Sequence, residues 1–230
     1  MDSIKKVKSI SIWIFLIPFI AVNLCLYTST FHPELFKSGQ AIYGKIFPYI
    51  DGKASISRTA RYFPNYLIFK PAMILTSFFL INYWGNNRKI FLNLDNTNKT
   101  IQKFYFFGVA SAIFLILHSI FLGVKFDNDL YKLFRRFVLL GFVIFEIVAQ
   151  SLLIYLLYKY KKLIIEYINP KFLMAKLTLV SMLILVTFLS IPIVSQPGNK
   201  FIKHALEWDY FLGVITFYIF TFLLWKKKNN

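Results

Sequence analysis

The sequence predicts an all-α, polytopic membrane protein in which six transmembrane helices form one bundle. Of its 230 residues, 57% are hydrophobic and 20% aromatic, and only 16% are charged, a composition too apolar for a soluble domain. Six stretches are long enough to cross a bilayer core of about 30 Å, which takes roughly 20 apolar residues per helix. These stretches are continuously apolar rather than alternating, which disfavours membrane-spanning strands.

The expected helices follow from these apolar runs. Three lysines precede the first run, which lacks a small-x-small cleavage site and is therefore expected to remain as a signal-anchor helix. The second run follows the X-Pro step Phe63-Pro64. The third contains Gly108 and Ala112, a small-xxx-small pair that predicts close helix packing. One domain of residues 1–230 is expected, with helices at about 10–27, 66–84, 104–124, 137–158, 173–194 and 206–225.

The net charge of +17 at pH 7 is carried almost entirely by lysines and arginines between the apolar runs. That distribution indicates the positive-inside effect and anionic head groups, and it disfavours nucleic acid as a partner. With the amino terminus inside, inner segments hold fifteen basic residues and outer segments eleven, so both termini are expected inside. The sequon at Asn98 then lies on the inner side, away from glycosylation. Lys70 and Lys176, near helix ends, are expected to snorkel to the interface.

The longest connection, residues 28–65, is expected on the outer side. It combines X-Pro steps, a turn-like Asp51-Gly52 and a polar run from Ser55 to Arg58. Connections of this length without an obvious helix are usually functional. The junction of this loop with the second apolar run is therefore the expected place for a ligand to meet the bundle.

Several loop residues also match a known family pattern. The chain has Phe47–Ile50, then Ser55–Ser57, then Phe63–Phe69 leading into the second helix, and Glu207-Trp208 where the last helix opens. This combination resembles the Frag/DRAM/Sfk family of six-span membrane proteins, which includes the Golgi factor that remodels the lipid of GPI anchors. The chain departs from the family pattern at Arg58–Arg61, where small residues are expected, and it lacks a histidine near the start of the fourth helix. The resemblance implies a six-span fold, membrane lipids and GPI-anchored proteins as partners, and a role in lipid remodelling.

Candidate site residues are polar or ionisable groups expected at membrane depth or at the outer mouth: Glu146, His118, Arg58, Arg61, Gln150 and Glu207. Ionisable groups inside a bilayer are expensive and usually face a cavity or a partner. Glu146 and Gln150 are four residues apart and share a helix face. Arg58 and Arg61 could hold a phosphate in bidentate fashion, with Glu146 or His118 as a base. Together these residues are expected to line an outward-facing polar pocket.

Each candidate also has a structural explanation. Glu146 could hold the bundle together by interhelical hydrogen bonds, and His118 could be a satisfied packing residue. Arg58 and Arg61 could contact solvent or head groups.

No cofactor and no metal are expected. HExxH, CxxC, GxGxxG, P-loop and GxSxG motifs are absent, and the three histidines are scattered. The single cysteine, Cys25, allows no internal disulfide.

The expected function is that of an integral membrane factor in lipid or GPI-anchor lipid remodelling or homeostasis. The alternatives are a non-catalytic membrane scaffold or regulator and a small transporter, although repeats and broken helices typical of transporters are absent. The C-terminal Lys227-Lys228-Asn229-Asn230 resembles a dilysine retrieval signal, which in a eukaryote would indicate the endoplasmic reticulum or Golgi. Lysines also commonly flank a last helix. In a prokaryote the expected location is the cytoplasmic membrane.

Overall fold

The computed structural model describes residues 2–40, 42, 44, 46–124, 129–196 and 198–226. Within these residues the protein is all-α and has six helices long and apolar enough to cross a membrane, which confirms the predicted fold class. The long helices are α1 (Asp2–Phe31), α4 (Tyr66–Leu92), α5 (Lys99–Phe121), α6 (Asp129–Lys159), α8 (Pro170–Ser195) and α9 (Lys200–Leu224). The connections hold the short elements η1 (Pro33–Leu35), α2 (Pro48–Asp51), α3 (Ile56–Ala60) and α7 (Lys161–Ile164).

Most of the long helices extend beyond the apolar runs that predict them. Hydropathy marks the part of a helix that lies in hydrocarbon, whereas backbone hydrogen bonding continues through the polar turns at each end. Two caps illustrate where the helices begin. Asn98 accepts a hydrogen bond from Thr100 N at 3.0 Å, and Asn169 accepts one from Lys171 N at 3.1 Å. Side chains of this type satisfy the free N–H groups of a first turn, so α5 and α8 start in the polar segments.

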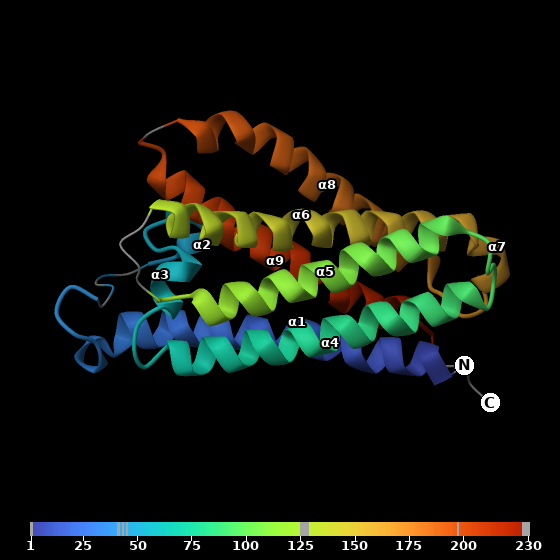
Figure 1. The fold of residues 1–230 in the computed structure, drawn as a ribbon, viewed down its shortest axis with the longest axis horizontal. Helices are drawn as coiled ribbons and strands as arrows, with labels where there is room; N and C mark the ends of the chain where they lie inside the picture. Colours follow the sequence, from blue (N-terminus) through green and yellow to red (C-terminus); the bar gives the residue numbers. More distant parts are fainter. Residues whose placement is uncertain are drawn as a thin grey trace.

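The six long helices form a closed ring. Each packs against the long helix before and after it in sequence, and α1 packs against α9. Figure 1 shows both chain termini at one end and the α2–α3 loop at the other. We call the loop-bearing end the outer end and the end with the termini the inner end, following the predicted orientation. Toward the outer end, α8 draws away from α6 (Figure 1), and α8 is the least buried of the six.

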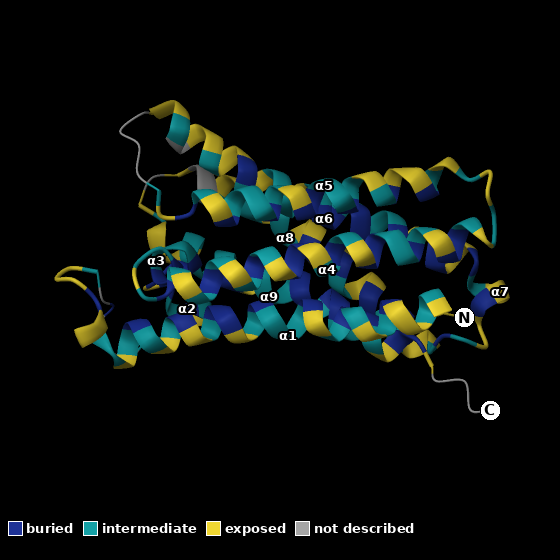
Figure 2. Cartoon of the chain, turned by 60° about the horizontal axis from the view of Figure 1, so that its bottom comes forward, coloured by how far each residue is buried: buried dark blue, intermediate teal, exposed yellow. Residues whose placement is uncertain are grey.

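The centre of the bundle is aromatic. Figure 2 shows buried residues along the inward faces of the long helices and exposed residues along their outward faces. Tyr83 packs edge-to-face against Trp84 and Tyr218, with ring centroids 5.0 Å apart in each pair. Gly108 and the fully buried Ala112 lie where α5 meets α4, and a Cβ on Gly108 would stand 2.3 Å from the Trp84 ring. The small-xxx-small prediction of close packing is therefore confirmed.

The inner end is held by a polar contact between two connections. The Tyr160 hydroxyl donates to the Asp95 carboxylate at 2.5 Å and accepts from Asn98 Nδ2 at 3.0 Å. The hydrogen bonds from Tyr160 and then from Thr97 lower the pKa of Asp95 to about 2. Because this pKa is depressed, the contact is fully present above the ordinary carboxyl pKa and weakens only as the pH falls toward 2.

Candidate functional site

Glu146 lies in the core with no exposed surface, and its carboxylate is bound from three helices. Ser111 on α5 donates to Oε2 at 2.6 Å, Gln150 on α6 donates to Oε1 at 3.0 Å, and the Tyr218 hydroxyl on α9 donates to Oε1. Gln150 Nε2 also lies 3.3 Å from Val214 O on α9. The predicted pair Glu146 and Gln150 therefore shares a face as expected and joins α5, α6 and α9.

A second buried ionisable group was predicted incorrectly. Lys176 does not snorkel to the interface: it is fully buried, and its Nζ donates to Thr221 Oγ1 at 2.6 Å and lies 3.7 Å from the Phe217 ring centroid. Thr221 Oγ1 is also 3.1 Å from the Tyr83 hydroxyl. On α8, Lys176 stands on the stripe of the buried residues Leu173, Val180 and Leu183. That periodicity could have predicted an inward-facing lysine.

We expect Lys176→Met to leave the folding stability unchanged or to raise it by about 1–3 kcal/mol, because a buried ammonium without a carboxylate partner has a large desolvation penalty. Thermal unfolding in mild detergent measures the effect, with Lys171→Met, at an exposed position on the same helix, as the control. A marked loss of stability in Lys176→Met but not in Lys171→Met would mean that the contacts of Lys176 with Thr221 and Phe217 outweigh its desolvation penalty.

The outer loop docks onto α9. His204 Nδ1 donates to Gly52 O at 2.9 Å, Trp208 Nε1 donates to Ala54 O at 2.8 Å, and Ser57 N lies 3.4 Å from Glu207 Oε1. The three α9 residues are spaced i, i+3 and i+4, so they share one face of the helix. Glu207-Trp208 therefore fastens α2 and α3 to the bundle.

Asn65 fastens the other side of the loop and was not predicted. Its Nδ2 lies 2.7 Å from Cys25 O, 2.8 Å from Ser29 Oγ and 2.7 Å from Thr59 O. Its Oδ1 accepts from Thr28 at 2.5 Å, and the residue has no exposed surface. Asn65 directly precedes α4 but makes no side-chain capping bond, so its helix-start position gave no indication of this role.

We expect Asn65→Ala to destabilise the protein by about 1–3 kcal/mol, since buried polar groups on α1 and α3 lose their partner. Unfolding in detergent and protease sensitivity of the loop both test this. Asn82→Ala, at an exposed α4 position, is the control. Equal stability of the two variants would contradict a fastening role for Asn65.

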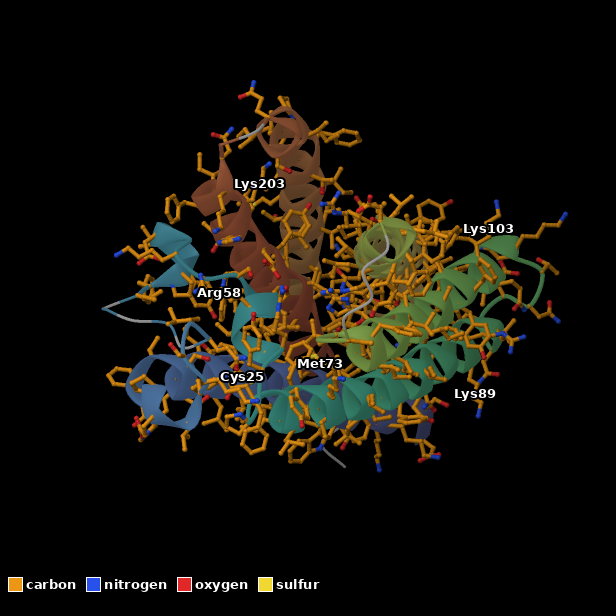
Figure 3. The ribbon with its side chains drawn as sticks, turned by 60° about the vertical axis from the view of Figure 1, so that its left-hand side comes forward. Cys25, Arg58, Met73, Lys89, Lys103 and Lys203 are labelled. Carbon is orange, nitrogen blue, oxygen red and sulfur yellow. The ribbon has the colours of Figure 1, made fainter. Side chains whose placement is uncertain are left out.

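The loop arginines lie partly buried at the outer mouth. Figure 3 looks toward this end of the molecule and labels Arg58. Arg61 folds back on its own helix, with Nε 2.8 Å from Ser57 O and Nη2 2.5 Å from Ser57 Oγ. Burial, then the positive charges of Arg135 and Arg58, lower the pKa of Arg61, while Glu207 opposes this effect. Arg135, on α6, was not among the predicted residues.

The structure places the six predicted residues at two levels. Arg58, Arg61 and Glu207 meet at the outer mouth, whereas Glu146 and Gln150 lie deeper. Glu207 and Tyr218 are 11 residues apart on α9, which is about 16 Å of helix. His118 lies about two turns beyond Ser111 toward the outer end of α5. His118 therefore belongs with the outer group.

Comparisons with known proteins add no functional assignment. No family model matches the chain, no curated protein matches it, and no solved structure matches it. Within the described ranges, no three His, Cys, Asp or Glu side chains gather as metal ligands would. The predicted dilysine signal lies outside the described residues. The fold and the site define a class, a multi-pass membrane protein whose outer mouth is basic and is covered by a docked loop.

Proposed function

We propose that this protein is a multi-pass membrane factor in lipid or GPI-anchor lipid remodelling or homeostasis, acting at its outer mouth. The observation that carries the proposal is the pair of partly buried arginines, Arg58 and Arg61, held by a docked loop at the outer ends of the helices. Arginine recognises phosphate through its planar fork of donors. At this level of the bundle, the phosphates of lipid head groups are the abundant anions.

The loop itself also favours a lipid surface. Phe47 is 60% exposed, Ile50 81% and Phe63 59%, although all three belong to the polar connection. Exposed apolar side chains next to basic ones are typical of segments that lie in the interface of a membrane.

Membrane lipids and GPI-anchored proteins are the expected partners. This expectation rests on the family resemblance. The expected location is the endoplasmic reticulum or Golgi in a eukaryote and the cytoplasmic membrane in a prokaryote.

One observation favours the alternative of a non-catalytic scaffold or regulator. Glu146 has no exposed surface, and both its oxygens are hydrogen-bonded by Ser111, Gln150 and Tyr218. A carboxylate bound in this way joins three helices and has no free oxygen directed at a substrate.

The test compares the lipid of a GPI-anchored reporter, by mass spectrometry, in cells that have or lack the gene. We expect deletion to change the anchor lipid and the wild-type gene to restore it. An unchanged lipid after deletion would overturn the proposed function.

Glu146→Gln then separates remodelling from scaffolding. An amide oxygen in the place of Oε1 can still accept from Tyr218 and Gln150, and the amide NH2 can donate to Ser111 Oγ, but the amide cannot act as an acid or base. Acid–base groups contribute about 10²–10⁴-fold to rates, so a catalytic carboxylate predicts at least a tenfold loss of restored lipid at normal protein level. Full restoration of the anchor lipid by Glu146→Gln would mean that Glu146 has a structural role and would favour the non-catalytic scaffold. The comparison is made at matched membrane abundance.

A further inference from the structure

The described part of the core contains one buried acid and one buried base. Glu146 on α6 and Lys176 on α8 have no exposed surface, and no other lysine, arginine or acidic residue of that part is fully buried. Both residues lie within helices long and apolar enough to cross a membrane, where ionisable groups are costly and usually pair with one another. The two residues are therefore candidates to balance each other's charge.

One face of α9 holds both groups. Lys176 Nζ donates to Thr221 Oγ1 at 2.6 Å, and the Tyr218 hydroxyl donates to the carboxylate of Glu146. Thr221 and Tyr218 are three residues apart, about 4.5 Å along the helix, so they lie on the same face. Tyr83 of α4 contacts both: its hydroxyl is 3.1 Å from Thr221 Oγ1, and its ring centroid is 5.0 Å from that of Tyr218. The acid and the base are thus joined through neighbouring residues of α9.

The contacts of the two groups indicate which of them carries the proton. The oxygens of Glu146 accept hydrogen bonds from three side chains, an environment that favours an ionised carboxylate. The Lys176 nitrogen lies 3.7 Å from the Phe217 ring centroid, a contact that favours an ammonium. Among the described residues, no carboxylate lies within salt-bridge distance of this ammonium, so its charge is balanced across Thr221 and Tyr218 rather than by direct contact.

The neighbouring helices add no further charge at this level. Tyr218 of α9 and Tyr83 of α4 are buried phenols, which are neutral at physiological pH. The contact from α5 is the hydroxyl of Ser111. The buried side chains of α1 carry no charge, and its Cys25 lies beside Asn65 at the outer loop. The charge on Glu146 is therefore expected to depend on Lys176.

We propose that Glu146 and Lys176 form one proton-binding site in the core of the bundle, and that the resting site holds its proton on Lys176. The site is then neutral as a carboxylate with an ammonium. Acids and bases paired at membrane depth are typical of proton relays, so the core has a role separate from that of the outer mouth. This inference goes beyond the proposed function.

Removing the ammonium is expected to move a proton onto Glu146. A lone buried carboxylate has a large desolvation penalty, and the group avoids that penalty by binding a proton from solvent. The core of Lys176→Met is then uncharged, in keeping with the stability expected for that variant.

The test is infrared spectroscopy of the purified full-length protein in detergent, because a protonated carboxyl group has a carbonyl band that a carboxylate lacks. The band of Glu146 is identified as the one that Glu146→Gln removes. Spectra over a pH series compare the wild type with Lys176→Met. The matched control is Lys171→Met, which removes an exposed lysine from the same helix.

At neutral pH we expect the wild type and Lys171→Met to lack the Glu146 band and Lys176→Met to show it. The ratio of protonated to ionised Glu146 in Lys176→Met is expected to be at least about tenfold higher than in the wild type, which corresponds to a shift of about one pH unit. Thr221→Val keeps both charges but removes the hydroxyl between them, so it should raise this ratio by a smaller factor. It is also the test variant if Lys176→Met does not fold.

Three results would contradict the inference. A Glu146 band of equal size in the wild type and Lys176→Met would mean that the two groups do not share a proton. A strong band in the wild type at neutral pH would place the resting proton on Glu146. Equal bands in Lys171→Met and Lys176→Met would reduce the effect to a general loss of positive charge. None of these results bears on the anchor lipid measured in cells, so the proposed function is judged separately.

Discussion

Gly108→Ala is expected to destabilise the bundle by about 1–3 kcal/mol, the usual range for overpacking a tight core. The new Cβ would stand 2.3 Å from Trp84 Cδ2 and 2.4 Å from Cγ, at the root of the indole rather than at its tip. Trp84 is fully buried, and its ring packs against Tyr83 and Phe104. Because those neighbours are themselves buried, the indole cannot turn away, and α4 and α5 must separate.

Gly85→Ala is the matched control because Gly85 lies on α4 with nothing within 4 Å of its ideal Cβ. In open space, a helical glycine replaced by alanine gains up to about 1 kcal/mol from helix propensity. Relative to the wild type, we therefore expect Gly108→Ala to unfold more easily in detergent and Gly85→Ala to unfold less easily. Equal stability of Gly108→Ala and Gly85→Ala would contradict a close contact between α4 and α5 at Trp84.

The fold was predictable because its determinants are local in sequence. Continuous apolar runs identify the helices, and lysines between them mark the ends, so the six-helix architecture needs no knowledge of tertiary contacts. Gly108 and Ala112 were predictable for the same reason, since a small pair on one helix face indicates close packing. Helix ends were less predictable, because caps such as Asn98 and Asn169 lie in polar segments that hydropathy does not mark.

The site was predictable only in part, because its contacts join distant segments. Glu146 and Gln150 lie four residues apart, and their shared face follows from helix geometry. The partners Ser111 and Tyr218 come from other helices, and no local pattern indicates them. Arg135 was not predicted for a similar reason. Together with Arg136 it forms a basic pair near a helix end, and such pairs are common in membrane proteins.

Lys176 shows how a local rule can mislead. A lysine near a helix end usually extends to the interface, and that rule predicted snorkelling. The opposing indication was its place on the apolar stripe of α8, where Thr221 and the Phe217 ring of α9 receive the ammonium. For Lys176, the spacing of the buried positions on α8 is therefore a better predictor than its distance from the helix end.

Gly52→Ala is expected to release the outer loop from the bundle. Gly52 ends α2 in the left-handed region at φ +57°, and a Cβ there would stand 1.7 Å from Phe201 O and 2.5 Å from its carbonyl carbon. Those atoms are backbone of α9, so no side-chain rotation relieves the overlap. The loop must lift, and the contacts from His204 to Gly52 O and from Trp208 to Ala54 O are lost with it.

Gly39→Ala isolates the clash from the backbone strain. Gly39 also has a positive φ, +78°, but nothing lies within 4 Å of its ideal Cβ. Both variants carry the left-handed penalty of about 1–2 kcal/mol, and Gly52→Ala alone also disrupts docking, so we expect it to lose about 2 kcal/mol more. Limited proteolysis between residues 46 and 62 should become faster only in Gly52→Ala. Because α3 carries Arg58 and Arg61, the same variant should also bind lipids with phosphate head groups less tightly, while Gly39→Ala retains that binding. Equal proteolysis of the two variants would mean that the loop does not rest on α9.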